Sequence, residues 1–155
     1  MKPDIKKLLI SLGIPLAVGG LSALITGGMS DYGMLNQPPL APPGWVFPVV
    51  WTVLYLLMGY ASYRVLTSGA DKEQIKKALL LYGLQLVFNF LWSPVFFGLQ
   101  WRLVAFFLLL ILWVLIALTI RAFSAIDERA GDLLVPYFLW VTFAAYLNLG
   151  VYLLN

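Results

Sequence analysis

A row of polar side chains interrupts one of the long apolar stretches of this chain. It consists of Gln85, Asn89, Trp92 and Ser93. Intervals of three and four residues place these side chains on one face of an α-helix. Amide, indole and hydroxyl groups form hydrogen bonds, but the row contains no acid, no base and no activated nucleophile. The chemistry that it supports is therefore recognition by hydrogen bonding.

Two further groups of the same kind lie before and after this row. One has helical spacing, with a small residue between larger ones: Tyr137, Trp140, Ala144 and Asn148. The other is Trp51, Thr52 and Tyr55. Polar side chains at membrane depth are costly and face the interior of a bundle. They can bond one helix to another, or they can line a pocket for a flat hydrophobic ligand, and the residues alone leave both interpretations open.

Several kinds of chemistry are excluded by what the sequence lacks. It contains no cysteine and no histidine, which excludes Cys/His zinc sites and catalysis by either residue. Ion-coupled transporters usually carry ionisable groups at membrane depth, but five long runs have none: 8–30, 32–63, 78–101, 103–120 and 133–155. We therefore expect no metal, no cofactor and no light-independent catalysis. We expect no nucleic-acid partner either, because the chain has no basic tract.

These apolar runs are long enough to cross a membrane. Hydrophobic residues make up 62% of the chain and charged residues 11%, with a mean hydropathy of +0.91, whereas a soluble domain has about 25% charged residues. A spanning helix needs about 20 residues, and the prolines of 37–44 predict a loop within the second run. We predict an all-α integral membrane protein, a single domain over 1–155. Its five transmembrane helices are expected near 8–26, 45–66, 78–99, 102–123 and 133–154.

The basic residues predict the orientation in the membrane. With a cytoplasmic N-terminus, nine of the ten Lys and Arg residues lie on the cytoplasmic side and Arg102 alone lies outside. The positive-inside rule favours this topology, which puts the C-terminus outside. Asp71, with Gln74 three residues later, predicts the N-cap of the third helix. The alternative for the first span is a signal peptide cleaved near 21–23, although its apolar stretch is long for one.

Three blocks of the sequence resemble the TspO/MBR family, the tryptophan-rich sensory or translocator proteins. They are Pro42–Tyr55, Tyr82–Gly98 and Pro136–Asn148, and their order and spacing over five spans fit that family. The resemblance implies a five-helix bundle, here of the bacterial type and in the cell membrane, that is often a homodimer. It also implies binding of porphyrins such as protoporphyrin IX and of isoquinoline or benzodiazepine drugs.

The resemblance further implies which residues bind the ligand. Positions that match the family motif are Tyr32, Trp51, Asn89, Trp140 and Ala144. The same helix faces add Tyr55, Gln85, Trp92, Ser93 and Asn148. The implied function is that of a receptor or sensor for tetrapyrroles, in their transport or in stress regulation. The alternative is light- and oxygen-dependent porphyrin breakdown, for which Trp51 and Trp140 are the candidate electron donors.

Two features depart from the family pattern. The loop carries Leu40 where the family often has a tryptophan, which alters packing over the pocket. Animal members end in a cholesterol motif with a basic residue, whereas Tyr152 is followed here by Leu-Leu-Asn, so we expect no cholesterol binding. Small residues that could serve either a dimer or packing within the monomer are Gly13, Ala17, Gly19, Ala23, Ala78 and Gly83.

Overall fold

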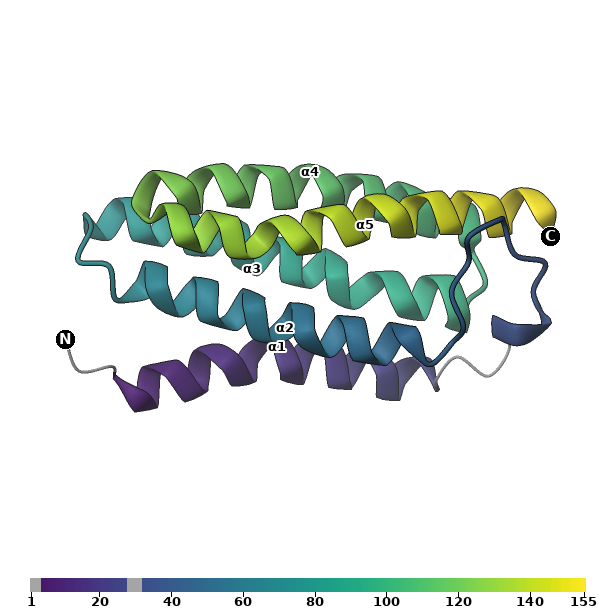
Figure 1. Ribbon diagram of the computed structural model, residues 1–155, viewed down its shortest axis with the longest axis horizontal. Coiled ribbons are helices and arrows are strands. Elements are labelled where there is room, and N and C mark those ends of the chain that lie inside the picture. Colours follow the sequence, from purple (N-terminus) through teal and green to yellow (C-terminus); the bar gives the residue numbers. More distant parts are fainter. Residues whose placement is uncertain (1–3, 28–31) are drawn as a thin grey trace.

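The computed structural model describes residues 4–27 and 32–155, and within them the chain forms the five predicted long helices. These are α1 (Ile5–Thr26), α2 (Val46–Leu66), α3 (Lys72–Ser93), α4 (Arg102–Ile126) and α5 (Glu128–Leu154). Two short elements accompany them, the 3₁₀ turn η1 (Tyr32–Met34) and the π-helical turn η2 (Pro94–Gly98). Figure 1 shows the helices side by side, with the start of α1 and the end of α5 at opposite ends of the bundle. Each long helix is long and apolar enough to span a membrane.

Capping side chains fix where several helices begin. The Asp71 carboxylate accepts a hydrogen bond from the Gln74 amide at 3.4 Å, which confirms the predicted N-cap of α3. Asp127 caps α5 in the same way through the Arg129 amide at 3.1 Å. Helix α3 therefore starts at Lys72, directly after its predicted cap and before the predicted span near 78, whereas α5 starts at Glu128, earlier than the predicted 133. Their polar first turns lie outside the apolar runs, but the caps satisfy the free amides of those turns.

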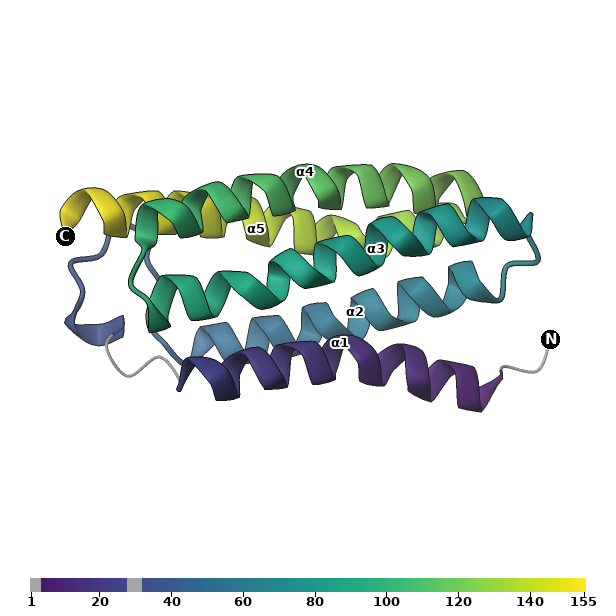
Figure 2. The ribbon, with the colours of Figure 1, turned by 180° about the vertical axis from the view of Figure 1, so that it is seen from behind.

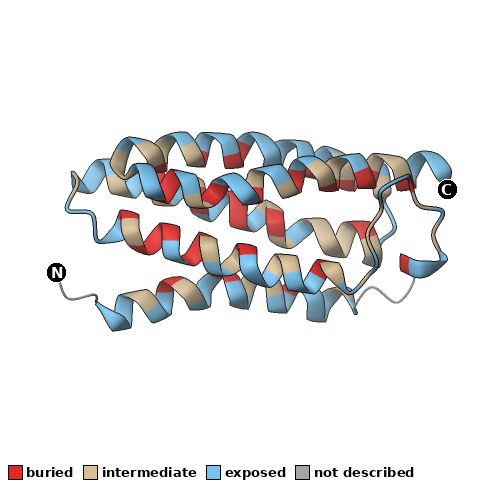
Figure 3. Cartoon of the chain, in the orientation of Figure 1, coloured by how far each residue is buried: buried red, intermediate tan, exposed pale blue. Residues whose placement is uncertain are grey.

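The helices form a closed ring in the order α1, α2, α5, α4, α3. Among the described residues α1 contacts α2, α3 and η2 but neither α4 nor α5, and so covers one side of the bundle (Figure 2). Buried residues lie mainly where the helices face one another, and exposed residues lie on their outer sides (Figure 3). Many of the outward side chains are large and apolar, as expected for a surface in contact with lipid.

Glycine allows α1 and α2 to approach closely. A Cβ at Gly59 would lie 2.6 Å from the Ser11 carbonyl oxygen and 2.7 Å from the Leu12 Cα. Gly19 of α1 packs against the ring of Tyr55 on α2, where a Cβ would overlap the ring. Gly19 therefore serves packing within the monomer, whereas a Cβ at Gly13 would meet nothing within 4 Å. The homodimer stays a prediction.

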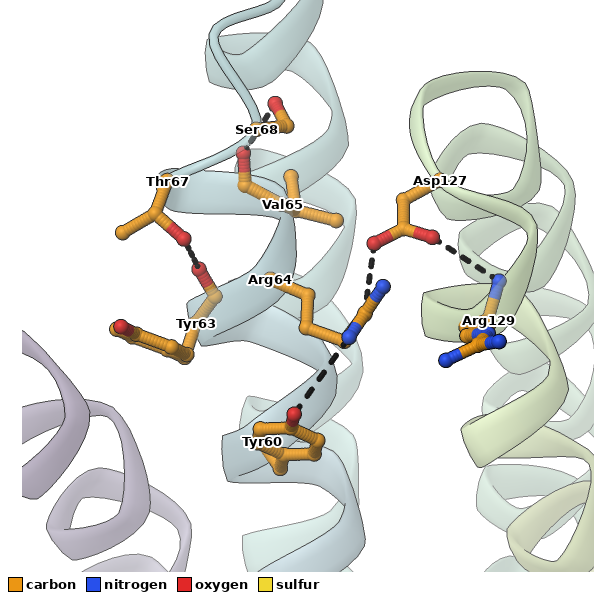
Figure 4. A network of polar contacts seen from close by, with 8 residues as sticks. All are labelled: Tyr60, Tyr63, Arg64, Val65, Thr67, Ser68, Asp127 and Arg129. Carbon is orange, nitrogen blue, oxygen red and sulfur yellow. Dashed lines mark hydrogen bonds and ion pairs between the residues drawn. The ribbon is translucent and has the colours of Figure 1, made fainter. Parts of the chain in front are cut away.

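An ion pair closes the end of the bundle that holds the turn between α4 and α5. Arg64 Nε donates to Asp127 Oδ2 at 2.7 Å, and the guanidinium also lies over the Tyr60 ring, 5.9 Å from its centroid. Figure 4 shows Asp127 between Arg64 and the amide of Arg129. The hydrogen bond from Arg64 is the main reason that the pKa of Asp127 lies below its usual range. This pair fixes α2 against the start of α5.

Candidate ligand-binding site

A cavity of about 550 Å³ lies among α1, α2, α3, η2 and α5. It is at the end of the bundle that carries the C-terminus, since its walls include Tyr32, Gly44 and Val151. α1 contributes small side chains to its wall, among them Gly19, Gly20 and Ala23. The volume is in the range of small-molecule sites, which is roughly 300–1,000 Å³. The cavity is therefore large enough for a sizeable ring ligand.

Two stacked pairs of aromatic rings form part of the cavity wall, one on α2 and the other on α3 and η2. Trp51 stacks on Tyr55 with ring centroids 5.6 Å apart and an interplanar angle of 26°. Trp92 stacks on Phe96 at 5.1 Å and 25°. The π-helical turn that carries Phe96 is closed by the Leu99 amide donating to the Pro94 carbonyl at 2.9 Å. Offset stacking on such rings favours a flat aromatic ligand.

A chain of hydrogen bonds begins at the cavity wall and leads into the core. Tyr55 Oη donates to Asn89 Oδ1 at 2.9 Å, Asn89 Nδ2 donates to Tyr137 Oη at 2.8 Å, and Tyr137 Oη donates to Gln85 Oε1 at 2.7 Å. Tyr55 and Asn89 line the cavity. Tyr137 and Gln85 lie behind them and are each 1% exposed. The chain joins α2, α3 and α5.

Two further pairs of polar groups in the cavity wall also bond one helix to another. Trp92 Nε1 donates to Asn148 Oδ1 at 2.9 Å, which ties α3 to α5. The hydroxyls of Thr26 and Ser93 lie 3.1 Å apart and tie α1 to α3. The two interpretations left open by the sequence are thus not exclusive, because the same side chains connect the helices and line the cavity.

The loop that contains Tyr32 is anchored beside the cavity. Tyr32 Oη donates to the Pro42 carbonyl at 2.7 Å, and its ring meets Phe47 edge-on at 5.0 Å. Burial raises the pKa of the Tyr32 phenol above its usual range. The loop is tied to α5 by Tyr146 Oη, which donates to the Pro39 carbonyl at 2.6 Å. Leu40 has a φ of 73° and is 84% exposed, so its side chain points away from this packing.

The structure brings most of the predicted site residues together. Those that line the cavity are Tyr32, Trp51, Tyr55, Asn89, Trp92, Ser93, Ala144 and Asn148. Gln85 lies one shell deeper. Trp140 lies in a separate shallow groove between α2 and α5, edge-on to Trp51 at 6.5 Å. Positions four residues apart are rotated by about 40° around a helix, which is enough to turn Trp140 and Gln85 away from the cavity that Ala144 and Asn89 face.

Several lining residues were not among the predicted ones. Phe47, one turn before Trp51, lines the cavity, as do Phe96 and Phe97 of the π-helical turn. The helical spacing of Phe47 and Trp51 was a usable signal, whereas a π-helical turn has none in this sequence. Gly19 of α1 was considered only for helix packing and the adjacent Gly20 not at all, although both line the cavity, where small residues leave space for a ligand.

The fold and the cavity define a class: an integral membrane protein of five helices with an aromatic pocket among them. A model of the TspO/MBR family matches residues 11–154. The chain is 39% identical to the tryptophan-rich protein TspO of Chlorobaculum tepidum, over 100% of this chain and 99% of that protein. It is 44% identical to the tryptophan-rich sensory protein of Cereibacter sphaeroides (80% and 76% covered) and 39% identical to the translocator protein of Ovis aries (78% and 72%). The chain belongs to the TspO/MBR family.

Proposed function

We propose that this protein is a receptor or sensor that binds a tetrapyrrole, such as protoporphyrin IX, in the cavity among α1, α2, α3 and α5. Isoquinoline and benzodiazepine drugs bind in the same place. The observation that carries the proposal is a cavity of about 550 Å³ with two stacked aromatic pairs and two side-chain amides, Asn89 and Asn148, in its wall. The role of binding is porphyrin transport or stress regulation.

The chemistry of the wall supports a flat and mostly uncharged ligand. A porphyrin ring gains from stacking against Trp51 or Trp92. Within the described part of the chain, no lining residue carries a charge. A buried carboxylate without a partner is costly, so the ligand's carboxylates stay at the mouth of the cavity while its ring enters.

The proposal includes an orientation in the bacterial cell membrane. Nine of the ten basic residues lie on the side of the N-terminus, which is therefore cytoplasmic. The cavity lies at the opposite end of the bundle, where the C-terminus and the Tyr32 loop are. The ligand consequently binds in the outer half of the membrane.

Binding is tested by titrating the purified protein with protoporphyrin IX while tryptophan fluorescence is recorded. We expect the ligand to quench the fluorescence, because Trp51 and Trp92 lie in the cavity wall. The quenching should saturate at one ligand per chain, because the ligand occupies this cavity. An isoquinoline drug should displace the porphyrin competitively. Quenching that rises linearly without saturation, as in partition into detergent micelles, would contradict the proposal.

A second candidate function is light- and oxygen-dependent breakdown of the bound porphyrin. It is favoured by Trp51, an oxidisable side chain that lines the cavity and stacks on Tyr55. The porphyrin absorbs the light, oxygen is the oxidant, and the protein supplies position and an electron donor. The test is loss of porphyrin absorbance in light with oxygen, compared with darkness and with nitrogen.

A further inference from the structure

The hydrogen-bonded chain behind the cavity has a direction. Each hydroxyl or amide donates to the next member, from Tyr55 through Asn89 and Tyr137 to Gln85. At the inner end Gln85 Nε2 is buried and has no hydrogen-bond partner in the described part of the chain. The inner end thus has unused capacity to donate.

The opposite direction is equally consistent with the positions of the heavy atoms. The oxygen and nitrogen of a side-chain amide occupy almost the same space, so an Asn or Gln can turn over without new contacts. If both amides turn, Gln85 donates to Tyr137, Tyr137 to Asn89, and Asn89 to Tyr55. The number of internal hydrogen bonds stays the same. Only the two ends change, so groups that meet the ends decide the direction.

We propose that this chain of hydrogen bonds reverses its direction according to the ligand. One cavity then accepts both ligands that donate a hydrogen bond and ligands that accept one. This inference rests on the proposed function of the cavity. In the direction described above, the Tyr55 proton is committed to Asn89, and its oxygen offers only lone pairs to the cavity. In the reverse direction the Tyr55 hydroxyl is free to donate. A ligand with an N–H or O–H favours the first direction, and one with a carbonyl or bare ring nitrogen favours the second.

Gln85 is a positioning residue in this scheme, because it does not line the cavity and acts through Tyr137 and Asn89. Replacing it by leucine removes the acceptor that Tyr137 uses. The Tyr137 proton must then go to Asn89, which turns its amide and donates to Tyr55. The Gln85→Leu variant is therefore expected to keep the hydrogen bonds in the reverse direction, in which the Tyr55 hydroxyl donates into the cavity.

The test measures two flat tricyclic probes in wild type and Gln85→Leu. Carbazole offers only an N–H donor, and acridine, at a pH where it is uncharged, offers only a nitrogen acceptor. We expect Gln85→Leu to weaken carbazole and to strengthen acridine, shifting the ratio of their dissociation constants by about fivefold, as for one exchanged hydrogen bond. The control is Thr119→Val, because the buried Thr119 hydroxyl donates within its own helix, to the Leu115 carbonyl of α4. That variant should leave the ratio unchanged.

A merely structural role for Gln85 predicts something different. Equal weakening of both probes, or an unchanged ratio, would overturn the reversal while leaving the cavity as the binding site. If neither probe displaces protoporphyrin IX from the wild type, the proposed binding of flat aromatic ligands in this cavity is contradicted instead. Should Gln85→Leu not fold, Tyr137→Phe interrupts the row of hydrogen bonds instead. It should shift the ratio of the two dissociation constants in the same direction, but by less.

A second readout needs no ligand. The phenol C–O stretch in isotope-edited infrared spectra differs between a tyrosine that donates and one that accepts a hydrogen bond. Subtracting the spectrum of Tyr55→Phe isolates the band of Tyr55. We expect this band to move from the donor to the acceptor position in Gln85→Leu, and a band that does not move would overturn the reversal directly.

Discussion

Trp51 and Trp140 occupy different environments, and this difference predicts different photochemistry. Trp51 lines the cavity, whereas Trp140 lies in the outer groove between α2 and α5. If bound porphyrin is degraded in light, Trp51→Phe should slow its loss several-fold, because phenylalanine keeps the stacking surface but is much harder to oxidise. Trp140→Phe should slow it less. The measurement is porphyrin absorbance during illumination, and equal rates in both variants and in empty micelles would reduce the process to ordinary bleaching.

The sequence predicted which residues lie in this region better than it predicted which of their side chains face the cavity. Asn89 and Ala144 face the cavity, as expected from their helical spacing. Gln85 has the same spacing relative to Asn89, but it lies behind the wall and bonds to Tyr137. A helical face about 100° wide contains both kinds of position. Only the rotation of each helix within the bundle separates them, and a single sequence does not report that rotation.

At the scale of elements, contact between α1 and α2 depends on Gly59. A Cβ there would lie 2.6 Å from the Ser11 carbonyl oxygen, so the helices must move apart in Gly59→Ala. We expect a loss of roughly 1–3 kcal/mol in the free energy of unfolding, as for other overpacked sites. Thermal unfolding in detergent measures it. Gly13→Ala is the matched control on α1, since its Cβ would meet nothing within 4 Å, and equal stability of the two variants would refute the contact.

The ion pair between Arg64 and Asp127 predicts a dependence of stability on pH. Because the folded pKa of Asp127 is lowered by Arg64, the pair stabilises the fold above the unfolded pKa of about 4, and this contribution is lost as the pH falls through the folded value. Asp127→Asn keeps a capping oxygen for α5 but removes the charge. It should lower the free energy of unfolding by about 1 kcal/mol at neutral pH.

The comparison of wild type with Asp127→Asn across pH isolates that contribution. The difference in melting temperature should shrink toward zero in acid. Glu128→Gln is the control, because Glu128 is the adjacent acidic residue and is exposed. A difference that is the same at all pH values would show that the Arg64 pair is not its cause.

Helix number and helix ends differ in how well the sequence predicts them. The charges between apolar runs separate the five spans, and Asp71 marks the start of α3 as predicted. The polar first turn of α5 was missed, because a capped turn outside the membrane needs no hydrophobic side chains and so lies outside the apolar run. The π-helical turn η2 was not predicted either, since its i→i+5 hydrogen bond leaves no periodic signal in so short a segment.

At the scale of the whole molecule, the topology can be tested with introduced cysteines, because the chain has none. Ser68, between α2 and α3, is predicted to face the cytoplasm, and Leu40, which is 84% exposed, to face outside. An impermeant thiol reagent applied to intact cells should therefore label Leu40→Cys and spare Ser68→Cys. The reverse pattern would invert the proposed orientation.

The cavity itself is tested most directly by filling it. Ala144 is 4% exposed and lines the cavity on α5, where a phenylalanine would occupy the space of the ligand ring. We predict that Ala144→Phe weakens protoporphyrin IX binding at least tenfold, about 1.4 kcal/mol. Ala117→Phe adds the same bulk at an exposed position of α4 and should leave the affinity unchanged. Wild-type affinity in a folded Ala144→Phe protein would contradict the assignment of this cavity as the ligand site.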